Sequence, residues 1–403
     1  MKKFQLPFGV QDFMPSECYN KIAVEQKLAA VFAAHGFLRV SLPAIEFFDA
    51  YDRVLDRSAV KKTFKTTDSD GSLLMLRFDP TLQICRMAES KLEPELINKV
   101  YYLENSYEYI SDETTARSRE FPQAGVELLG NSGSAGDMEI VVTAIESLLA
   151  AGLGDFMLEL GQVDYFNGIA MESGLSDSDA GELRALINKK DMLGVEMFLR
   201  DKNVNEKFVA QFLKLPSLFG DCEVFERARA GVCNERSLNA IDGLETVVNA
   251  LKAAGLDKYV SVDLGLLRGE YYTGMVMKGF STEFGMPILD GGRYDGLCSS
   301  FGSPMPAVGF CIGVKRLLIA LEKELKLTTP KFIDCAYISD GKSFKKEYEY
   351  VSKLRSKGFA LEKLFADGEN ALEEYCETKG IENAFAITGN TVKYVRGKEP
   401  CDK

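Results

Sequence analysis

The chain has 403 residues, of which 46% are hydrophobic, so it exceeds one ordinary domain and can bury a large core. Its formal net charge of −12 makes it a poor non-specific binder of nucleic acid. No run approaches the roughly 18 apolar residues of a membrane span, and the start, MKKFQLPFGVQDFMP, lacks the apolar stretch of a secretory signal.

Nine cysteines and a single histidine, His35, limit the chemistry that the chain can carry. No two cysteines have the C-x-x-C spacing, which argues against a zinc site and for reduced thiols in the cytosol. One histidine also leaves Ser-His-Asp and Cys-His catalysis without support. In FAAHGFLRV, His35 is expected to end a helix before Gly36, where its charge suits the helix dipole.

The first predicted elements are a helix over residues 17–35 and a following strand that is broken at Pro43. GSLLMLRFDPTLQICRMAESKL indicates a strand that enters a helix, with Asp79 as the N-cap and a proline at the first helical position. Asp79, Gln83 and Arg86 would then share one helix face. On this segment alone, a helix cap followed by a solvated stripe is the simpler interpretation.

A β-hairpin is predicted for residues 100–130, VYYLENSYEYISDETTARSREFPQAGVELLG, because two β-rich flanks enclose the turn cluster ISDETTARS. Alternate residues of its second strand share a face, so Val126 and Leu128 would point into a core. The opposite face would carry Gln123, Gly125 and Glu127. A polar face with a glycine gap is typical of the floor of a pocket for a small polar molecule.

Further along, residues 137–152 indicate a helix, and DFMLELGQVDYFNGI indicates a strand. From about 172 to 256 nearly every segment has helical character, which predicts an inserted helical block. Strands resume at Tyr259 and lead through a Gly-rich strand pair into a helix, before a linker near LTTPKF. The tail, residues 331–403, alternates strand, helix, strand, helix, strand, as in a small α/β unit.

Two segments in this region suit an anionic or polar ligand. LLRGEYYTGM places Arg268, Tyr271 and Tyr272 at a strand end, a combination that suits a carboxylate or a phosphate. On these residues alone, a surface arginine beside core aromatics explains the segment equally well. In LDGGRYDGL, the adjacent Gly291 and Gly292 would let a ligand or another backbone approach closely.

Three arginines are candidate anion-binding residues. Arg117 and Arg119 come just before the polar strand of the hairpin. Arg316, in GVKRLL, stands at the start of a helix, where a cation opposes the dipole and therefore suggests an anionic neighbour. Neither G-x-x-x-x-G-K-[ST] nor G-x-G-x-x-G occurs, so a bound nucleotide would need another device.

Together these segments resemble the class II aminoacyl-tRNA synthetases, and the histidyl branch in particular. GFLRVSLPAIE resembles motif 1, the dimer strand of that family; the hairpin resembles motif 2 and AVGFCIGVKRLL motif 3. LLRGEYYTGM resembles the histidine-binding motif, and GGRYDGL is another mark of the branch. The resemblance implies an α+β fold, a mainly antiparallel sheet with flanking helices, in a domain of residues 1–325. The tail, 331–403, resembles a shortened anticodon-binding domain.

One departure concerns the phosphate of ATP. Where the synthetases end the first strand of motif 2 in an arginine that grips the α-phosphate, YYLENSYEY offers Glu108. About 4 Å from a phosphate, this change turns an attraction of roughly 4 kcal/mol into a comparable repulsion. The amino-acid half of the pattern survives better, and the resemblance assigns histidine binding to Asp79, Thr81, Gln123, Glu127, Arg268, Tyr271 and Tyr272. Because RGEYY is one residue shorter than the synthetase form, the tyrosine register stays open.

The helical block resembles a different branch. RALINKKDMLGVEMFL and LKLPSLFGDCEVFERA resemble the insertion of the synthetase-like regulatory subunit of ATP phosphoribosyltransferase, and LRFDPT fits that family's form of its motif. This resemblance implies a chain without catalytic residues, metal or cofactor. It also implies a homodimer within a hetero-oligomer, whose partner is a short-form catalytic subunit of histidine biosynthesis.

The same resemblance implies that histidine is a feedback effector and that tRNA is not a partner. Many such subunits lack the tail or carry a degenerate one. This chain has such a tail, so two other identities stay open. They are an active histidyl-tRNA synthetase and a non-charging paralogue with another binding or scaffolding role.

Overall fold

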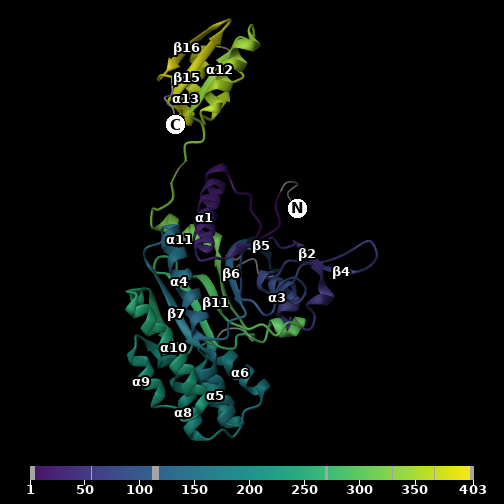
Figure 1. The fold of residues 1–403 in the computed structure, drawn as a ribbon, viewed down its shortest axis with the longest axis vertical. Coiled ribbons are helices and arrows are strands. Elements are labelled where there is room, and N and C mark those ends of the chain that lie inside the picture. The colour runs from purple at the N-terminus through teal and green to yellow at the C-terminus, as the bar shows by residue number, and fades with distance from the viewer. Residues whose placement is uncertain are drawn as a thin grey trace. The chain divides into compact units, whose positions relative to one another are not determined.

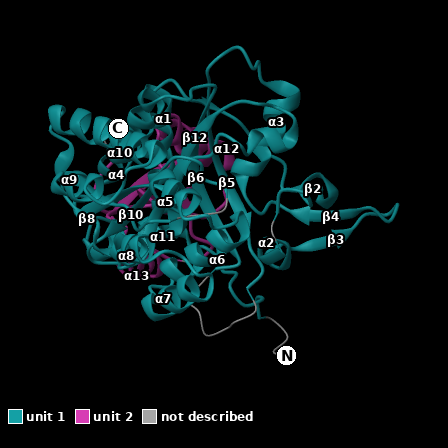
Figure 2. Cartoon of the chain, turned by 90° about the horizontal axis from the view of Figure 1, so that it is seen from below, with its two compact units in different colours: residues 1–327 teal, residues 328–403 magenta. Residues whose placement is uncertain are grey.

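The computed structural model describes residues 5–55, 57–110, 118–267, 271–328, 330–366 and 368–399. The chain divides into two compact units, residues 1–327 and residues 328–403 (Figure 2). Within the described ranges, no helix is both long enough and apolar enough to cross a membrane.

The centre of the first unit is a sheet of nine strands in the described part of the chain. The strand pairs are antiparallel except for β1 with β5 and β7 with β9, so the expected mainly antiparallel α+β fold is confirmed. Across the sheet the strands are β1 (Leu38–Arg39), β5 (Asn98–Tyr107), β6 (Glu120–Leu129), β12 (Ala307–Gly313), β11 (Pro287–Arg293), β10 (Met275–Ser281), β7 (Phe156–Gln162), β9 (Val260–Asp263) and β8 (Phe219–Gly220) (Figure 1).

One face of this sheet is covered by helices that bury the main hydrophobic core. The helices α1 (Pro15–Ala34), α4 (Ser134–Ala151) and α11 (Val314–Lys323) supply apolar side chains to it. His35 caps the end of α1, as predicted. Val126 and Leu128 of β6 belong to the same core, which confirms the predicted alternation and turns Glu127 toward the opposite face.

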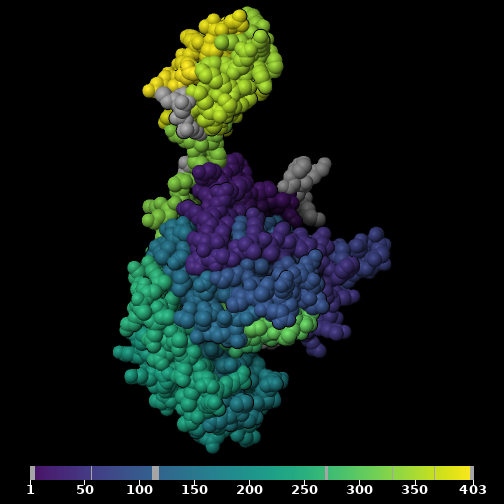
Figure 3. All heavy atoms as spheres, viewed as in Figure 1, coloured from purple at the N-terminus to yellow at the C-terminus, as the bar shows by residue number. Residues whose placement is uncertain are grey.

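The opposite face carries a smaller core built from α3 (Pro80–Lys91), η4 (Cys298–Phe301) and a three-stranded sheet. The strand order of that sheet is β2 (Ile45–Phe47), β4 (Leu73–Leu76), β3 (Lys65–Thr67). Between β2 and β3 the chain forms η1 (Phe48–Ala50) and α2 (Arg57–Lys62). β1 and β2 fall on either side of Pro43 and join different sheets. The β3–β4 hairpin stands out from the surface of the unit (Figure 3).

Helices dominate the region between β7 and β9, at the lower end of the unit in Figure 1. They are α5 (Val163–Glu172), α6 (Asp177–Asn188), α7 (Met192–Asp201), α8 (Glu206–Lys214), α9 (Glu223–Arg229) and α10 (Glu235–Ala253), with η2 (Leu215–Ser217) and η3 (Asp257–Tyr259). The prediction of a strand through residues 163–169 was wrong. Gln162 caps a helix there by accepting from the backbone N–H of Asp164, and the buried side chains of α5 include Val163, Phe166 and Ala170, which follow helical spacing.

In its described residues, the second unit has a four-stranded sheet and two helices. Its strand order is β14 (Leu361–Lys363), β13 (Cys335–Ser339), β15 (Asn383–Thr388), β16 (Thr391–Arg396), and its helices are α12 (Phe344–Ser356) and α13 (Glu369–Lys379). The sequence predicted one strand at the end where the structure has two. Thr388 pairs with Thr391, and the two residues between them form a tight hairpin turn in which Gly389 has a positive φ of 55°.

Candidate functional site

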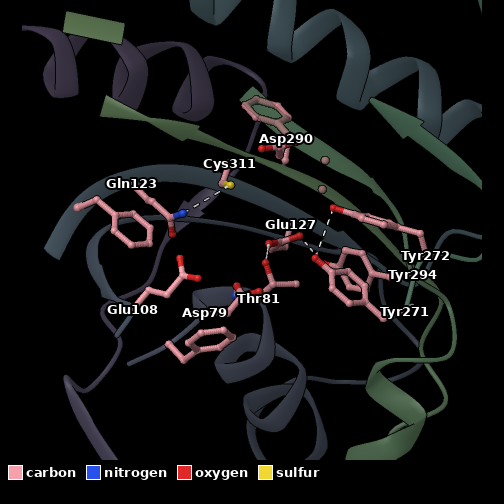
Figure 4. A pocket seen from close by; sticks show the side chains of 15 residues that line it. Asp79, Thr81, Glu108, Gln123, Glu127, Tyr271, Tyr272, Asp290, Tyr294 and Cys311 are labelled. Atoms are coloured by element: carbon pink, nitrogen blue, oxygen red, sulfur yellow. Dashed lines mark hydrogen bonds between the residues drawn. The ribbon is translucent and has the colours of Figure 1, made fainter. Parts of the chain in front are cut away.

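A cavity of about 170 Å³ lies on the face of β6 that points away from the α1–α4 core. Six of the seven predicted histidine-binding residues line it, namely Asp79, Thr81, Gln123, Glu127, Tyr271 and Tyr272. The seventh, Arg268, lies outside the described residues. Segments far apart in the sequence therefore meet at one pocket, which is shown in Figure 4.

The N-terminus of α3 brings two of these residues to the pocket. The side chain of Asp79 accepts a hydrogen bond from the backbone N–H of Thr81 at 2.9 Å, which confirms the predicted cap. The Thr81 hydroxyl in turn donates to Glu127 at 2.7 Å. The predicted stripe is not a solvated face, because Gln83 is buried and donates to the Pro43 carbonyl at 2.9 Å. Arg86 pairs with Glu46 at 2.5 Å.

Glu127 is the buried acid of the site, with only 1% of its surface exposed. Its carboxylate accepts hydrogen bonds from the hydroxyls of Thr81 and Tyr294. Burial raises the pKa of Glu127 to about 8; the two hydroxyls act in the opposite direction, and the nearby Asp79 adds to the increase. Burial also raises the pKa of Asp79.

Glycines make room for these side chains. Gly309 lies directly opposite Glu127 in the β6–β12 pair, and a Cβ there would overlap the Glu127 carboxylate. A Cβ on Gly292 would lie 2.9 Å from the Tyr272 ring, and one on Gly291 would lie 2.8 Å from the Phe310 backbone. The glycines of LDGGRYDGL thus allow close approach by the protein's own side chains and backbone.

Three tyrosines gather at one end of the pocket, whereas Gln123 and Glu108 lie at the other (Figure 4). The rings of Tyr271 and Tyr272 are 4.5 Å apart between centroids, and Tyr294 meets Tyr271 edge to face at 6.1 Å. Sequence reasoning missed Tyr294, although it stands directly after Arg293 in the quoted GGRYDGL. An aromatic residue placed just after a glycine pair was the available signal.

Arg293 fixes the strand end that carries Tyr294. It is 5% exposed and donates to the Asp137 carboxylate at 2.9 and 2.7 Å and to the Asn131 carbonyl at 2.7 Å. A further bond of 3.0 Å reaches Asp295. Because Asp137 lies in the first turn of α4, this network ties the helix to the end of β11.

A second cavity of about 620 Å³ shares Glu108, Gln123 and Cys311 with the first. Four cationic side chains line it, those of Lys62, Lys278, Lys315 and Arg316. Glu108 is paired with Lys62 at 3.0 Å, so a carboxylate is held where the two cavities adjoin. This acid is the residue that the sequence comparison placed at the position of the synthetase arginine.

The two described candidate anion-binding arginines, Arg119 and Arg316, do not converge on one site. Arg316 lines the second cavity and donates to the Pro287 carbonyl at 2.8 Å. Arg119 lies against the rings of Phe8 and Tyr109 and donates to the Ile110 carbonyl, so it serves the local packing. Arg117 lies outside the described residues. Within the described ranges, no group of three or more His, Cys, Asp or Glu side chains is placed to hold a metal ion.

Comparisons with known proteins agree on one family. The family model described as Histidyl-tRNA synthetase matches residues 9–317. The ATP phosphoribosyltransferase regulatory subunit of Acetivibrio thermocellus is 35% identical over 94% of this chain and 91% of its own length. The protein of that name from Thermoanaerobacter pseudethanolicus is also 35% identical, over 94% and 97%.

Solved structures show the same relationship. A structure from Bacillus halodurans, described as an ATP phosphoribosyltransferase regulatory subunit/histidyl-tRNA synthetase, has a TM-score of 0.83 at 27% identity and covers 96% of this chain and 99% of its own. Histidyl-tRNA synthetase from Nostoc shares the fold, with a TM-score of 0.78 at 20% identity over 96% and 92%. The chain therefore belongs to the histidyl-tRNA synthetase-like regulatory subunits of ATP phosphoribosyltransferase, and not to the catalytic subunits of that enzyme.

Proposed function

We propose that this chain activates a short-form ATP phosphoribosyltransferase catalytic subunit and gives the complex feedback inhibition by histidine. The observation that carries the proposal is a pocket that keeps the acids and tyrosines of an amino-acid site beside a reversed charge at Glu108. A site of this kind suits an effector that binds and dissociates without undergoing a reaction. The complex would act at the first step of histidine biosynthesis.

The described lining of the pocket offers partners for the ammonium group and the imidazole of histidine. Asp79 and Glu127 can hold the α-ammonium group, with the Gln123 amide beside them. Tyr271 or Tyr272 can meet the imidazole. Arg268 is proposed as the partner of the ligand carboxylate.

Within the second cavity, Glu108 argues against adenylate formation. Glu108 sits 3.0 Å from Lys62, so this pair presents no net positive charge to a phosphate. A triphosphate at this place would meet the Glu108 carboxylate where a synthetase supplies an arginine. The tail is proposed as a reduced relative of the anticodon-binding domain, without a tRNA partner.

We also propose that two copies of the chain associate within the hetero-oligomer. Leu38 is 72% exposed, Ile45 52% and Phe47 58%. Ile45 and Phe47 lie on one face of the small sheet, opposite Leu76 and Leu74. A second copy related by a two-fold axis would cover this apolar face and leave no edge open.

The test is calorimetric titration of histidine into the wild type, Glu127→Ala and Arg268→Ala, followed by inhibition assays of the complex reconstituted with the catalytic subunit. Removing one charge-assisted contact, worth roughly 1.5–3 kcal/mol, should weaken binding by about one to two decades. Because binding and inhibition are linked, the inhibition constant must shift with the affinity. Normal binding by both variants, with full feedback sensitivity of the complex, would place regulation elsewhere.

A further inference from the structure

Tyr102 occupies the glycine gap in the pocket floor. It lies on β5 directly opposite Gly125 of β6, and its side chain is fully buried in the core on the pocket side. A Cβ on Gly125 would overlap the hydroxyl end of the Tyr102 ring. Since Gly125 shares its face with Gln123 and Glu127, the phenol lies directly behind the cavity lining between these two residues, covered by that lining in the structure.

The hydroxyl of Tyr102 is a buried polar group without a hydrogen bond to the described residues. Such a group costs free energy, and a phenylalanine would fill the same space without that cost. Packing alone therefore explains the ring but not the hydroxyl.

The surroundings of this hydroxyl are the acids and polar groups of the pocket. Burial raises the pKa of Tyr102 well above its ordinary value, and Cys311, Glu127 and Asp79 are near enough to add to the increase. The Thr81 hydroxyl acts in the opposite direction, although it does not reach hydrogen-bonding geometry with the phenol. All four of these neighbours line the pocket.

We propose that Tyr102 is a positioning residue for the α-ammonium group of the bound amino acid. In the bound state its oxygen accepts a hydrogen bond from the ammonium group, and its O–H moves into hydrogen-bonding distance of the Thr81 oxygen and donates to it. Thr81 already donates its own proton to Glu127 at 2.7 Å, so its oxygen is able to accept. The inference rests on the proposed function and identifies which part of the ligand this residue reads.

Three chains and two ligands test the assignment by calorimetry. The chains are the wild type, Tyr102→Phe and Tyr101→Phe, a matched control whose side chain faces the α1 core 5.6 Å from the Phe32 ring. The ligands are histidine and 3-(imidazol-4-yl)propionate, which lacks the amino group. Tyr102→Phe should weaken histidine binding about tenfold, the size of one hydrogen bond to a charged group, and leave imidazolylpropionate within about twofold. Tyr101→Phe should change neither affinity.

The urea midpoint separates this role from a structural one, because Tyr102→Phe should keep or raise the wild-type value. Unchanged histidine binding by Tyr102→Phe would overturn the inference, and equal weakening of both ligands would overturn the assignment to the ammonium group. Failure of the wild type to bind histidine would instead refute the proposed function. Since the chain contains no tryptophan, the near-ultraviolet difference spectrum on adding histidine reports tyrosines directly, and part of it should vanish in Tyr102→Phe.

Discussion

The Thr81 hydroxyl donates a hydrogen bond of 2.7 Å to the carboxylate of Glu127. Thr81 belongs to the first turn of α3, and Glu127 lies 46 residues further along the chain, on the central sheet. The pocket floor is therefore completed only when α3 packs on that sheet. With the bond from Tyr294, Glu127 accepts from two hydroxyl groups. Among the described residues, no cation lies at hydrogen-bonding distance from its carboxylate.

Glu127→Gln should weaken histidine binding by about one to two decades while keeping the shape of the pocket. The variant removes an acid that an ammonium ligand would ionise, because a nearby positive charge lowers the pKa of a carboxyl group. It keeps one amide oxygen, which can accept from Tyr294 or from Thr81, whose hydroxyls bond different oxygens of Glu127. Calorimetric titration at pH 7.5 measures the change. Glu322→Gln, at an exposed position on α11, is the matched control and should bind like the wild type. Equal affinities for all three chains would rule out Glu127 as a ligand contact.

The stability of the ligand-free protein should fall as the pH rises from about 4.5 to 8. Over this range Glu127 binds its proton in the folded state, with a pKa of about 8, but has lost it in the unfolded state, with a value near 4.5. The folded state then holds more protons, so the free energy of unfolding decreases by at most about 1.4 kcal/mol per pH unit. Urea titrations at pH 5.5 and 7.5 should show a smaller pH effect in Glu127→Gln. An identical pH dependence in both chains would contradict the shifted pKa.

The chain alone should show only background pyrophosphate exchange with ATP and histidine. Glu108, held by Lys62 at 3.0 Å, places a negative charge where the phosphate would bind. Glu108→Arg should raise ATP affinity about tenfold without restoring turnover. The gain is no larger because solvent screens charges at this partly exposed position. Nucleotide titration and exchange assays measure both effects, with Glu322→Arg as a charge-matched control. Clear histidine-dependent exchange by the wild type would overturn the non-catalytic assignment.

Arg293→Met should destabilise the protein by about 3–5 kcal/mol, because it leaves the Asp137 carboxylate buried without its cation. Burial already raises the pKa of Asp137, and Arg293 opposes that increase. The double variant Arg293→Met/Asp137→Leu should recover most of the loss, since no unpaired charge is left. Urea unfolding of the three chains measures the effect. A single variant as stable as the wild type would show that the ion pair contributes nothing.

Phe47→Glu should convert a dimer to a monomer at micromolar concentration. The side chain is 58% exposed on the small sheet, and a buried carboxylate without a partner would oppose association there. Sedimentation velocity measures the change. Met197→Glu on α7, at a side chain that is 59% exposed, is the control and should stay dimeric. A wild type that sediments only as a monomer would refute the proposed interface.

Several features of this protein follow from the sequence because they depend on neighbouring residues. The Asp79 cap and its following proline use contacts within one helical turn, and both are present in the structure. The alternation that sends Val126 to the core and Glu127 to the pocket follows from the pleat of one strand. Short apolar runs are less informative, and for that reason residues 163–169 were predicted as a strand although they belong to α5.

Only the tertiary structure decided which residues share the pocket floor. Tyr294, just after β11, reaches Glu127, and Tyr102 on β5 lies opposite Gly125. The glycine pair before Tyr294 was the one local signal, and no local pattern marks Tyr102 as a member of the site. Gln83 was predicted on a solvated stripe, but packing of α3 against Pro43 buried it. The pKa of Glu127 was likewise beyond the sequence, because desolvation depends on every element that covers the carboxyl group. Local spacing determines which elements form and which way their side chains point, whereas contacts between distant segments determine which of those side chains meet.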